Sequence, residues 1–303
     1  HKGRNGYCTH IGNKYFAWFK STGSKSRINF LNLLRCEYTD FVLNDQALEY
    51  MAEQKLPGYQ LSKLLCHKDK IFKNETGWNK FLKRQKIKTE RHNRIATEGA
   101  LIGSITYHDF NPDLAIISDD AGQFDVFLHG LCWVHAERTI QKLVGYNAHQ
   151  NQLLDKAKAD IWKLYRALKK YRHNPSQPQK LKLETRFDSI FTLKTGFASL
   201  DVALKRIYQN KSELLLVLNR PDVPLHNNLS ERDIREYVKK RKISGSTRSD
   251  VGKKCRDTFT SLKKTCRKLG ISFWQYLIDR IECQNKYPPL AEIMESQMGH
   301  SGG

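Results

Sequence analysis

The chain has 303 residues, with 52 Lys and Arg side chains against 31 Asp and Glu, and its formal net charge is +21 at pH 7. No apolar run approaches the ~18 residues that span a bilayer, and a chain that is 39% hydrophobic and 27% charged is not typical of disordered proteins. The composition therefore excludes a membrane-spanning protein, and the positive excess indicates a polyanionic partner, with nucleic acid as the first candidate.

The first third of the chain predicts mixed strands and helices. Aromatic and β-branched residues on both sides of Gly12 and Asn13 indicate a hairpin over residues 6–20. Apolar periodicity then predicts a helix over 25–36, a short strand over 39–43 and a helix over 45–56. Residues 57–92 are polar and basic, and we interpret them as an inserted helical subdomain before a helix over 93–107.

The middle of the chain contains the clearest buried strand. Residues 114–117 are apolar, follow a Pro112-Asp113 turn and lead directly into Ser118, Asp119 and Asp120. A second apolar run over 127–134 leads into a helix from His135, and residues 150–218 are predicted to be helical throughout, with a break near Pro175 and Pro178. The pattern as a whole predicts an α/β fold with an all-helical insertion.

Two positions carry carboxylates that could bind a metal ion. Asp119 and Asp120 follow a buried strand, where sites assemble in α/β sheets, although adjacent acids at such a place can also cap the next helix. Glu231 shares a helical face with Ile234 and Val238, so it is expected to point toward the core, although Asn228 and Glu231 also fit a capping box. Carboxylates on neighbouring elements are the ligands that Mg²⁺ requires for phosphodiester chemistry.

The positive charge is concentrated in two segments. Residues 1–36 hold seven basic side chains and no acid, and residues 239–269 hold twelve basic side chains and two acids. These segments carry +17 of the +21, which favours a binding surface over a charge spread for solubility, although each run could be a solvated face. Phosphate contacts are expected from the second segment, at Lys239, Lys240, Arg241, Lys242, Arg248, Lys253 and Lys254.

The seven cysteines are odd in number and widely spaced, so neither a disulfide framework nor a structural zinc site is expected, and a reducing cytosolic setting fits. The sequence opens at His1 rather than Met, and we interpret it as part of a longer protein.

Three segments in order resemble the insertion sequence 66 family of bacterial DDE transposases: ISDDAGQF at 117–124, CWVHAER at 132–138 and HNNLSER at 226–232. The resemblance covers about residues 1–285. It implies a ribonuclease-H-like core and cleavage and strand transfer of double-stranded DNA at insertion-sequence ends, dependent on Mg²⁺ or Mn²⁺. It also implies a homo-oligomer on DNA, in the bacterial cytoplasm with the nucleoid and not at a membrane.

The resemblance assigns roles by position. Asp119 matches the second catalytic acid and metal ligand, with Asp120 as the alternative and Asp45 as a weaker rival, and Glu231 matches the third acid. Cys132 and His135 are expected to orient the site through hydrogen bonds, with zinc binding as the alternative, and Asn227 and Asn228 are expected to support it.

The resemblance also divides the chain. The core is expected to comprise 1–136 (with the subdomain 57–92) and 226–285, separated by the helical insertion 137–225 and followed by an extension over 286–303. Such a core places its first Asp on a strand before the 6–20 hairpin, yet no acid occurs before Glu37. We therefore expect the polypeptide to be inactive by itself, and a non-catalytic DNA-binding remnant is the alternative.

Overall fold

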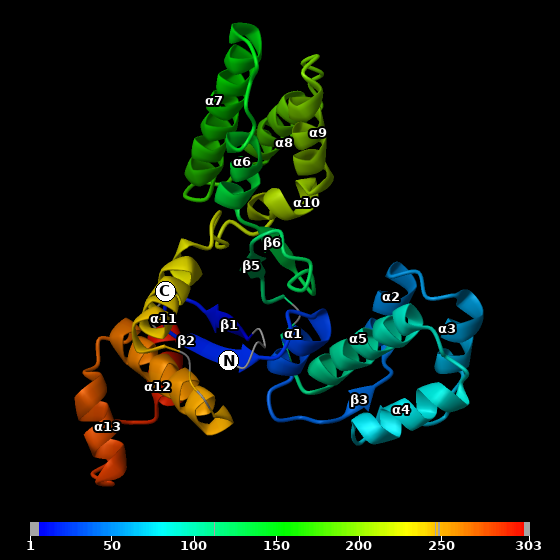
Figure 1. Ribbon diagram of the computed structural model, residues 1–303, viewed down its shortest axis with the longest axis vertical. Coiled ribbons are helices and arrows are strands. Elements are labelled where there is room, and N and C mark those ends of the chain that lie inside the picture. Colours follow the sequence, from blue (N-terminus) through cyan, green and yellow to red (C-terminus); the bar gives the residue numbers. More distant parts are fainter. Residues whose placement is uncertain (1–5, 112, 246, 248, 300–303) are drawn as a thin grey trace. The chain divides into compact units, whose positions relative to one another are not determined.

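The computed structural model describes residues 6–111, 113–245, 247 and 249–299. They form two compact units (Figure 1). The first, here called the hairpin unit, combines the described residues up to Lys25 with those from Asn228 onward. The second, here called the helical unit, runs from Ser26 to Asn227. The hairpin unit is therefore built from the two ends of the chain.

The predicted hairpin is confirmed. β1 (Tyr7–Gly12) pairs antiparallel with β2 (Ala17–Thr22), and the turn is closed by Asn13, whose N–H donates to the Phe16 carbonyl over 3.0 Å. A Cβ atom on Gly12 would lie 2.6 Å from the Phe16 oxygen. The turn therefore requires glycine at this position, as the sequence signal implied.

Helix α12 (Asp250–Lys268) protects the outer edge of β2. Three alternate N–H groups of the strand donate to side-chain oxygens spaced four residues apart on the helix. The bonds join Ala17 to Thr265, Phe19 to Ser261 and Ser21 to Asp257, over 3.2, 2.9 and 2.7 Å. Two strand residues rise about 6.7 Å and four helix residues about 6.0 Å, so the two periods match closely. The helix thereby satisfies an edge that would otherwise be open to another strand.

The other helices of the hairpin unit complete a small core. α11 (Asn228–Ser244) places the Tyr237 ring on that of Phe19, with centroids 5.2 Å apart. α13 (Phe273–Ile281) and α14 (Leu290–Gly299) follow the end of α12, which is set by Gly270 at φ +73°. Apolar residues of these segments form one cluster around Cys266, Leu269, Tyr276 and Leu290.

Helix α5 (Glu90–Tyr107) is the central helix of the first half of the helical unit. It packs against three elements that precede it, and Gly103 allows one of these contacts because a Cβ atom there would lie 2.1 Å from the Val42 oxygen. The three elements are α1 (Arg27–Leu34), β3 (Phe41–Val42) and α2 (Asp45–Glu53).

Residues 57–92 form two helices and a short strand and then enter α5. The elements are α3 (Gly58–Leu65), β4 (Ile71–Phe72) and α4 (Glu75–Arg84). β4 pairs antiparallel with β3, with Phe72 opposite Phe41, and the Trp78 ring stacks on Phe41 at 5.6 Å. Strand pairing and aromatic packing thus join this segment to the preceding part of the unit.

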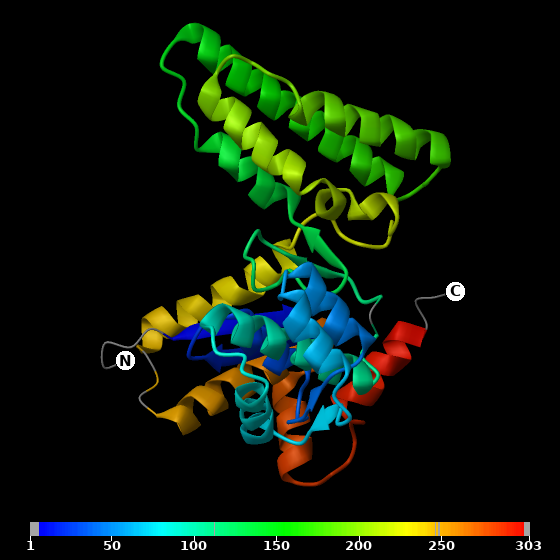
Figure 2. The same ribbon diagram turned by 90° about the vertical axis from the view of Figure 1, so that its right-hand side faces the viewer.

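The second half of the helical unit begins with a parallel pair, β5 (Ile116–Ser118) and β6 (His129–Leu131). α6 (Trp133–Gln141) follows at once, two residues earlier than predicted, and a helical block comes next (Figure 2). Its members are α7 (Ala148–Tyr171), α8 (Gln177–Phe191), α9 (Ala198–Gln209), α10 (Lys211–Leu214) and the 3-10 helix η1 (Leu216–Leu218). Trp133 joins the strands to this block, because its indole N–H donates to the Leu214 carbonyl over 2.8 Å and its ring meets Phe187 edge-on.

The protein therefore has an α/β fold, in which the described residues contain three separate two-stranded sheets: β1–β2, β3–β4 and β5–β6. Within the described part of the chain, no helix is both long and apolar enough to span a membrane. All seven cysteines are free thiols.

Candidate functional site

The two acids after β5 lie in different environments. Asp119 is half-buried, and its Oδ1 atom is inaccessible to solvent and has no hydrogen-bond partner among the described residues. Asp120 is exposed, and its Oδ2 atom pairs with Nη2 of Arg206 on α9 at 3.0 Å. Asp119 therefore has a buried carboxylate oxygen without a partner among the described residues, whereas Asp120 forms an ion pair at the surface.

Asp45, the weaker rival, lies at the start of a helix. It is the exposed first residue of α2, directly after the cap residue Asn44, whose side chain accepts from the Ala47 N–H at 3.0 Å. A carboxylate in a first helical turn is stabilised by the helix dipole, which gives Asp45 a structural role without a metal.

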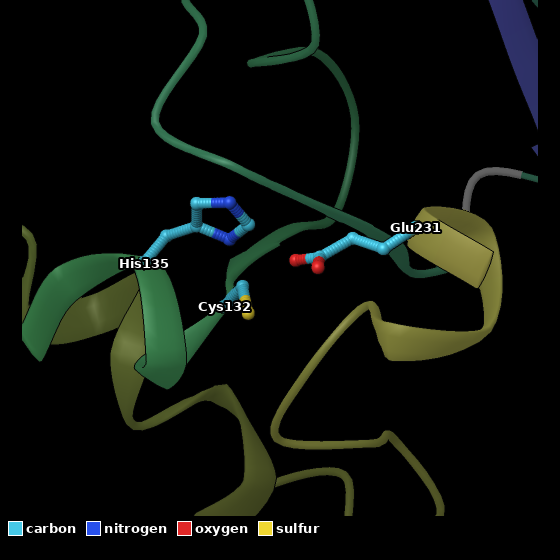
Figure 3. A group of neighbouring side chains, drawn as sticks. All are labelled: Cys132, His135 and Glu231. Carbon is cyan, nitrogen blue, oxygen red and sulfur yellow. The ribbon is translucent and has the colours of Figure 1, made fainter. Parts of the chain in front are cut away.

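Cys132 and His135 flank the start of α6, and Figure 3 shows both side chains. Cys132 is buried, and its N–H donates to the Ser118 carbonyl at 2.9 Å, which ties the helix to the end of β5. His135 Nε2 lies 3.0 Å from Nη1 of Arg138. Both residues line a small pocket of the helical unit together with Asp120 and Arg206. The backbone bond from Cys132 to Ser118 does not involve the Cys132 side chain, so the orienting role of Cys132 and His135 stays a prediction.

Glu231 belongs to the hairpin unit and is half-buried in the first turn of α11; its side chain is also drawn in Figure 3. An acid in that turn is favoured by the dipole. The helix already includes Asn228 as its first residue, so the cap position falls at Asn227, one residue before the one predicted. Asn227 and Asn228, at the start of α11, are both half-buried.

The buried face of α11 differs from the one predicted. Asp233 and Tyr237 are the buried residues of the helix, whereas Ile234 and Val238 are half-buried. An Asp at i and a Tyr at i+4 lie on one helical face. This spacing is the only sequence signal that could have indicated that Asp233 and Tyr237 form the buried face.

Asp233 is the centre of a buried charge cluster that sequence reasoning missed. Lys268 Nζ lies 3.0 Å from its Oδ2 atom, Lys264 Nζ lies 3.3 Å from Oδ1, and His10 Nε2 lies 3.3 Å from Oδ2. Burial raises the pKa of Asp233, but the His10 and Lys268 side chains more than offset this effect and hold the pKa well below its usual range. Lys264 also pairs with Glu236. Two lysines of the basic segment therefore have an internal role.

Asp257 forms a second buried polar group in the hairpin unit. Its Oδ1 atom accepts from the Tyr237 hydroxyl at 2.6 Å and from the Ser21 hydroxyl at 3.1 Å. Burial and the bond to Asp257 raise the pKa of Tyr237 well above its usual range. These bonds tie the middle of α11 to α12 and β2.

The remaining basic candidates differ in exposure. The run from Lys239 to Lys242 is fully exposed near the end of α11, and Lys254 is exposed on α12. Lys253 is half-buried and pairs with Asp250 at 2.9 Å. Arg248 lies outside the described residues. The exposed run is therefore the part of the basic segment best placed to contact phosphates.

The sequence profile described as "Transposase IS66 family" matches residues 121–255. The match includes Cys132, His135, Glu231 and the exposed lysines, and it begins directly after Asp119 and Asp120. This protein belongs to the IS66 family of transposases.

A curated relative extends the similarity over nearly the whole chain. The uncharacterized protein y4jO of Sinorhizobium fredii (strain NBRC 101917 / NGR234) is 42% identical over 294 residues, which is 96% of this chain and 92% of the relative. No solved structure matches the chain significantly.

Proposed function

We propose that this protein is a DDE-type transposase that cleaves DNA and transfers strands at insertion-sequence ends, with a ribonuclease-H-like catalytic core and Mg²⁺ or Mn²⁺ as cofactor. Family membership supports the class of reaction. The observation that carries the metal role is the buried Asp119 Oδ1 atom, which has no hydrogen-bond partner in the part of the chain that the structure describes. A buried carboxylate oxygen is costly without a compensating ligand, and a hard divalent cation is such a ligand.

The residues divide into ligands and supports. Asp119 and Glu231 would hold the cation, and Cys132, His135, Asn227 and Asn228 would support the segments that carry them. Asp120 is less suited because it forms an ion pair with Arg206 at the surface. When bound, Mg²⁺ stabilises the charge that develops on the attacking and leaving oxygens of the phosphodiester. The protein itself binds the DNA backbone and orients the two carboxylates.

The DNA partner is proposed to contact the exposed run Lys239–Lys242 together with Lys254. The expected substrate is double-stranded DNA at transposon ends and targets, bound by a homo-oligomer in the bacterial cytoplasm. A plot of log affinity against log salt concentration falls with a negative slope. Replacing Lys239 and Lys240 by Ala should make this slope less steep by about 0.9 for each phosphate that the variant no longer neutralises. The matched control replaces Lys169 and Lys170, which are exposed in the last turn of α7. Equal slopes in the two double variants would contradict the assignment.

The alternative is a DNA-binding protein without cleavage activity. It is favoured by one sequence observation, since residues 1–36 contain no Asp or Glu to serve as the first acid of the family. The polypeptide by itself is accordingly proposed to be inactive.

Cleavage assays separate the two functions. The protein is expressed from its complete reading frame and incubated with DNA carrying insertion-sequence ends, with Mg²⁺, with Mn²⁺ or with EDTA. The transposase should nick or join DNA only with metal, and Asp119→Asn and Glu231→Gln should abolish this, whereas Asp45→Asn should not. Salt-sensitive binding without cleavage in any condition would establish the alternative. A fully active Glu231→Gln protein would refute the role of Glu231 as a metal ligand.

A further inference from the structure

A continuous chain of hydrogen bonds links Glu213 to the backbone of Asp119 within the helical unit. His129 Nδ1 lies 2.6 Å from Glu213 Oε1, and His129 Nε2 lies 2.8 Å from Ser118 Oγ. The Ser118 hydroxyl in turn donates to the Asp119 carbonyl at 2.6 Å. The Ser118 and His129 side chains are buried, and Glu213 is half-buried on α10. No water is needed to connect the four residues.

The two hydrogen bonds that lead from His129 to Asp119 are donated in the same direction, toward Asp119. Ser118 has a single hydroxyl hydrogen, and it is donated to the Asp119 carbonyl. His129 Nε2 must therefore carry a hydrogen and donate to Ser118, because the serine oxygen can only accept there. The 2.6 Å contact between His129 Nδ1 and Glu213 Oε1 holds the imidazole ring in the orientation in which its Nε2 atom faces Ser118.

The parallel strand pair brings these groups together. Ser118 ends β5 opposite Leu131, and His129 begins β6 opposite Ile116. A Cβ atom on Gly130 would lie 2.7 Å from Ile117 Cδ1 and 3.0 Å from Leu216 Cδ2. The glycine therefore leaves room for these two side chains, and a Cβ atom there would also lie 3.5 Å from the Glu213 carbonyl oxygen. The start of α10 thus passes beside β6, which brings the Glu213 carboxylate within reach of His129.

We propose that Glu213, His129 and Ser118 form a positioning relay that fixes the Asp119 backbone, and with it the direction of the carboxylate that is to hold the divalent cation. The relay rests on the proposed function of Asp119. None of the three side chains touches the cation; they act through the carbonyl of the ligand residue, as outer partners commonly do at metal sites.

A direct role of His129 as a metal ligand fits less well. The ligand atoms of Asp125, His129 and Glu213 all lie within 4.8 Å of one another. Both imidazole nitrogens already have protein partners, however, and Asp125 is exposed and lies 3.6 Å from Arg27. The test must nevertheless separate a relay from a direct ligand.

A selective NMR label isolates the relevant carbonyl. The chain contains one Asp-Asp pair, Asp119-Asp120. Protein labelled with ¹³C-carbonyl Asp and ¹⁵N Asp therefore gives one HNCO signal, which reports on the Asp119 carbonyl. The same samples are titrated with Mn²⁺ alone to measure its affinity.

Four variants test the relay. Ser118→Ala and His129→Phe should shift the Asp119 carbonyl signal and weaken Mn²⁺ binding about tenfold, the lower end of the loss seen for outer partners of metal ligands. His129→Gln keeps a donor near the Nε2 position and should restore both readouts. Ser104→Ala is the matched control, because it removes a buried hydroxyl that donates to Asp40 at 2.7 Å elsewhere in the unit. It should change neither readout.

The outcomes are distinguishable. An unchanged carbonyl signal and Mn²⁺ affinity in Ser118→Ala would overturn the relay, as would equal losses in His129→Phe and His129→Gln. Loss of Mn²⁺ binding in His129→Phe but not in Ser118→Ala would identify His129 as a direct ligand and also overturn it. If the unaltered protein does not bind Mn²⁺, the proposed metal role of Asp119 fails, while the carbonyl signal still tests the relay.

Discussion

Replacing Asp233 by Asn should loosen the attachment of α11 to the rest of the hairpin unit. The carboxylate lies between Lys264 and Lys268 of α12 and His10 of β1, at 3.0 to 3.3 Å. Asn keeps the shape of the side chain but removes its charge. Two lysines that are almost entirely buried would then face each other without their shared counter-ion.

The magnitude follows from the geometry. At an effective dielectric constant of about 20, a charge pair 3 Å apart is worth roughly 5 kcal/mol. Part of this is offset because the freed ammonium groups can move toward water. Breaking a buried pair by removing one partner typically costs about 3–5 kcal/mol, and we expect a loss near the lower end of that range because Lys264 retains Glu236.

The pH dependence has a definite sign. Because the pKa of Asp233 is held well below its usual range, the stability it contributes is present above the unfolded value of about 3.9 and is lost as the pH falls through that value toward the lower folded one. The difference in stability between the unaltered protein and Asp233→Asn should therefore be constant near pH 7 and shrink below about pH 4.

Hydrogen exchange read by mass spectrometry assigns the effect to one unit. Peptides from β1, α11 and α12 should exchange faster in Asp233→Asn, whereas peptides from α7 serve as an internal reference. Asp250→Asn is the matched control, since its carboxylate is exposed and pairs with Lys253 at the surface. Unchanged exchange in α11, or a stability difference at pH 2 as large as that at pH 7, would refute the reasoning.

Two further predictions concern packing and thiol chemistry. Gly103→Ala should lower the free energy of unfolding by roughly 2 kcal/mol, because a Cβ atom 2.1 Å from the Val42 oxygen costs more than the ~1 kcal/mol that Ala gains in a helix. The control is Gly77→Ala, which should not destabilise the protein because the nearest atom to its Cβ would lie 3.6 Å away. Equal melting temperatures of the two variants would contradict the packing argument. Burial raises the pKa of the Cys8 thiol to about 11, so at pH 8 it should react with a disulfide reagent far more slowly than the exposed Cys36. Comparable rates of modification for the two cysteines, followed by mass spectrometry, would show that the Cys8 thiol is not protected.

Local patterns in the sequence were sufficient for most of the elements. The turn at Gly12 and Asn13 specified the hairpin, and apolar periodicity identified the helical block, because turn chemistry and helical repeat act between residues close in the chain. The same signals placed Asp119 directly after a strand, but β5 begins at Ile116 and is half-buried over its two isoleucines, and Leu114 of the predicted buried strand is exposed. Boundaries were less well defined: α6 begins at Trp133 rather than His135.

Tertiary contacts decided which side chains are buried and what they do. The sequence placed Ile234 and Val238 on the buried face of α11, but Asp233 occupies it because its counter-charges come from β1 and α12, at opposite ends of the chain. Likewise, Asp119 and Asp120 are adjacent acids with similar local signals, and their burial and the position of Arg206 distinguish them in the structure. A charge has no local period, so its partner, and hence the environment of each acid, is fixed only when distant segments fold together.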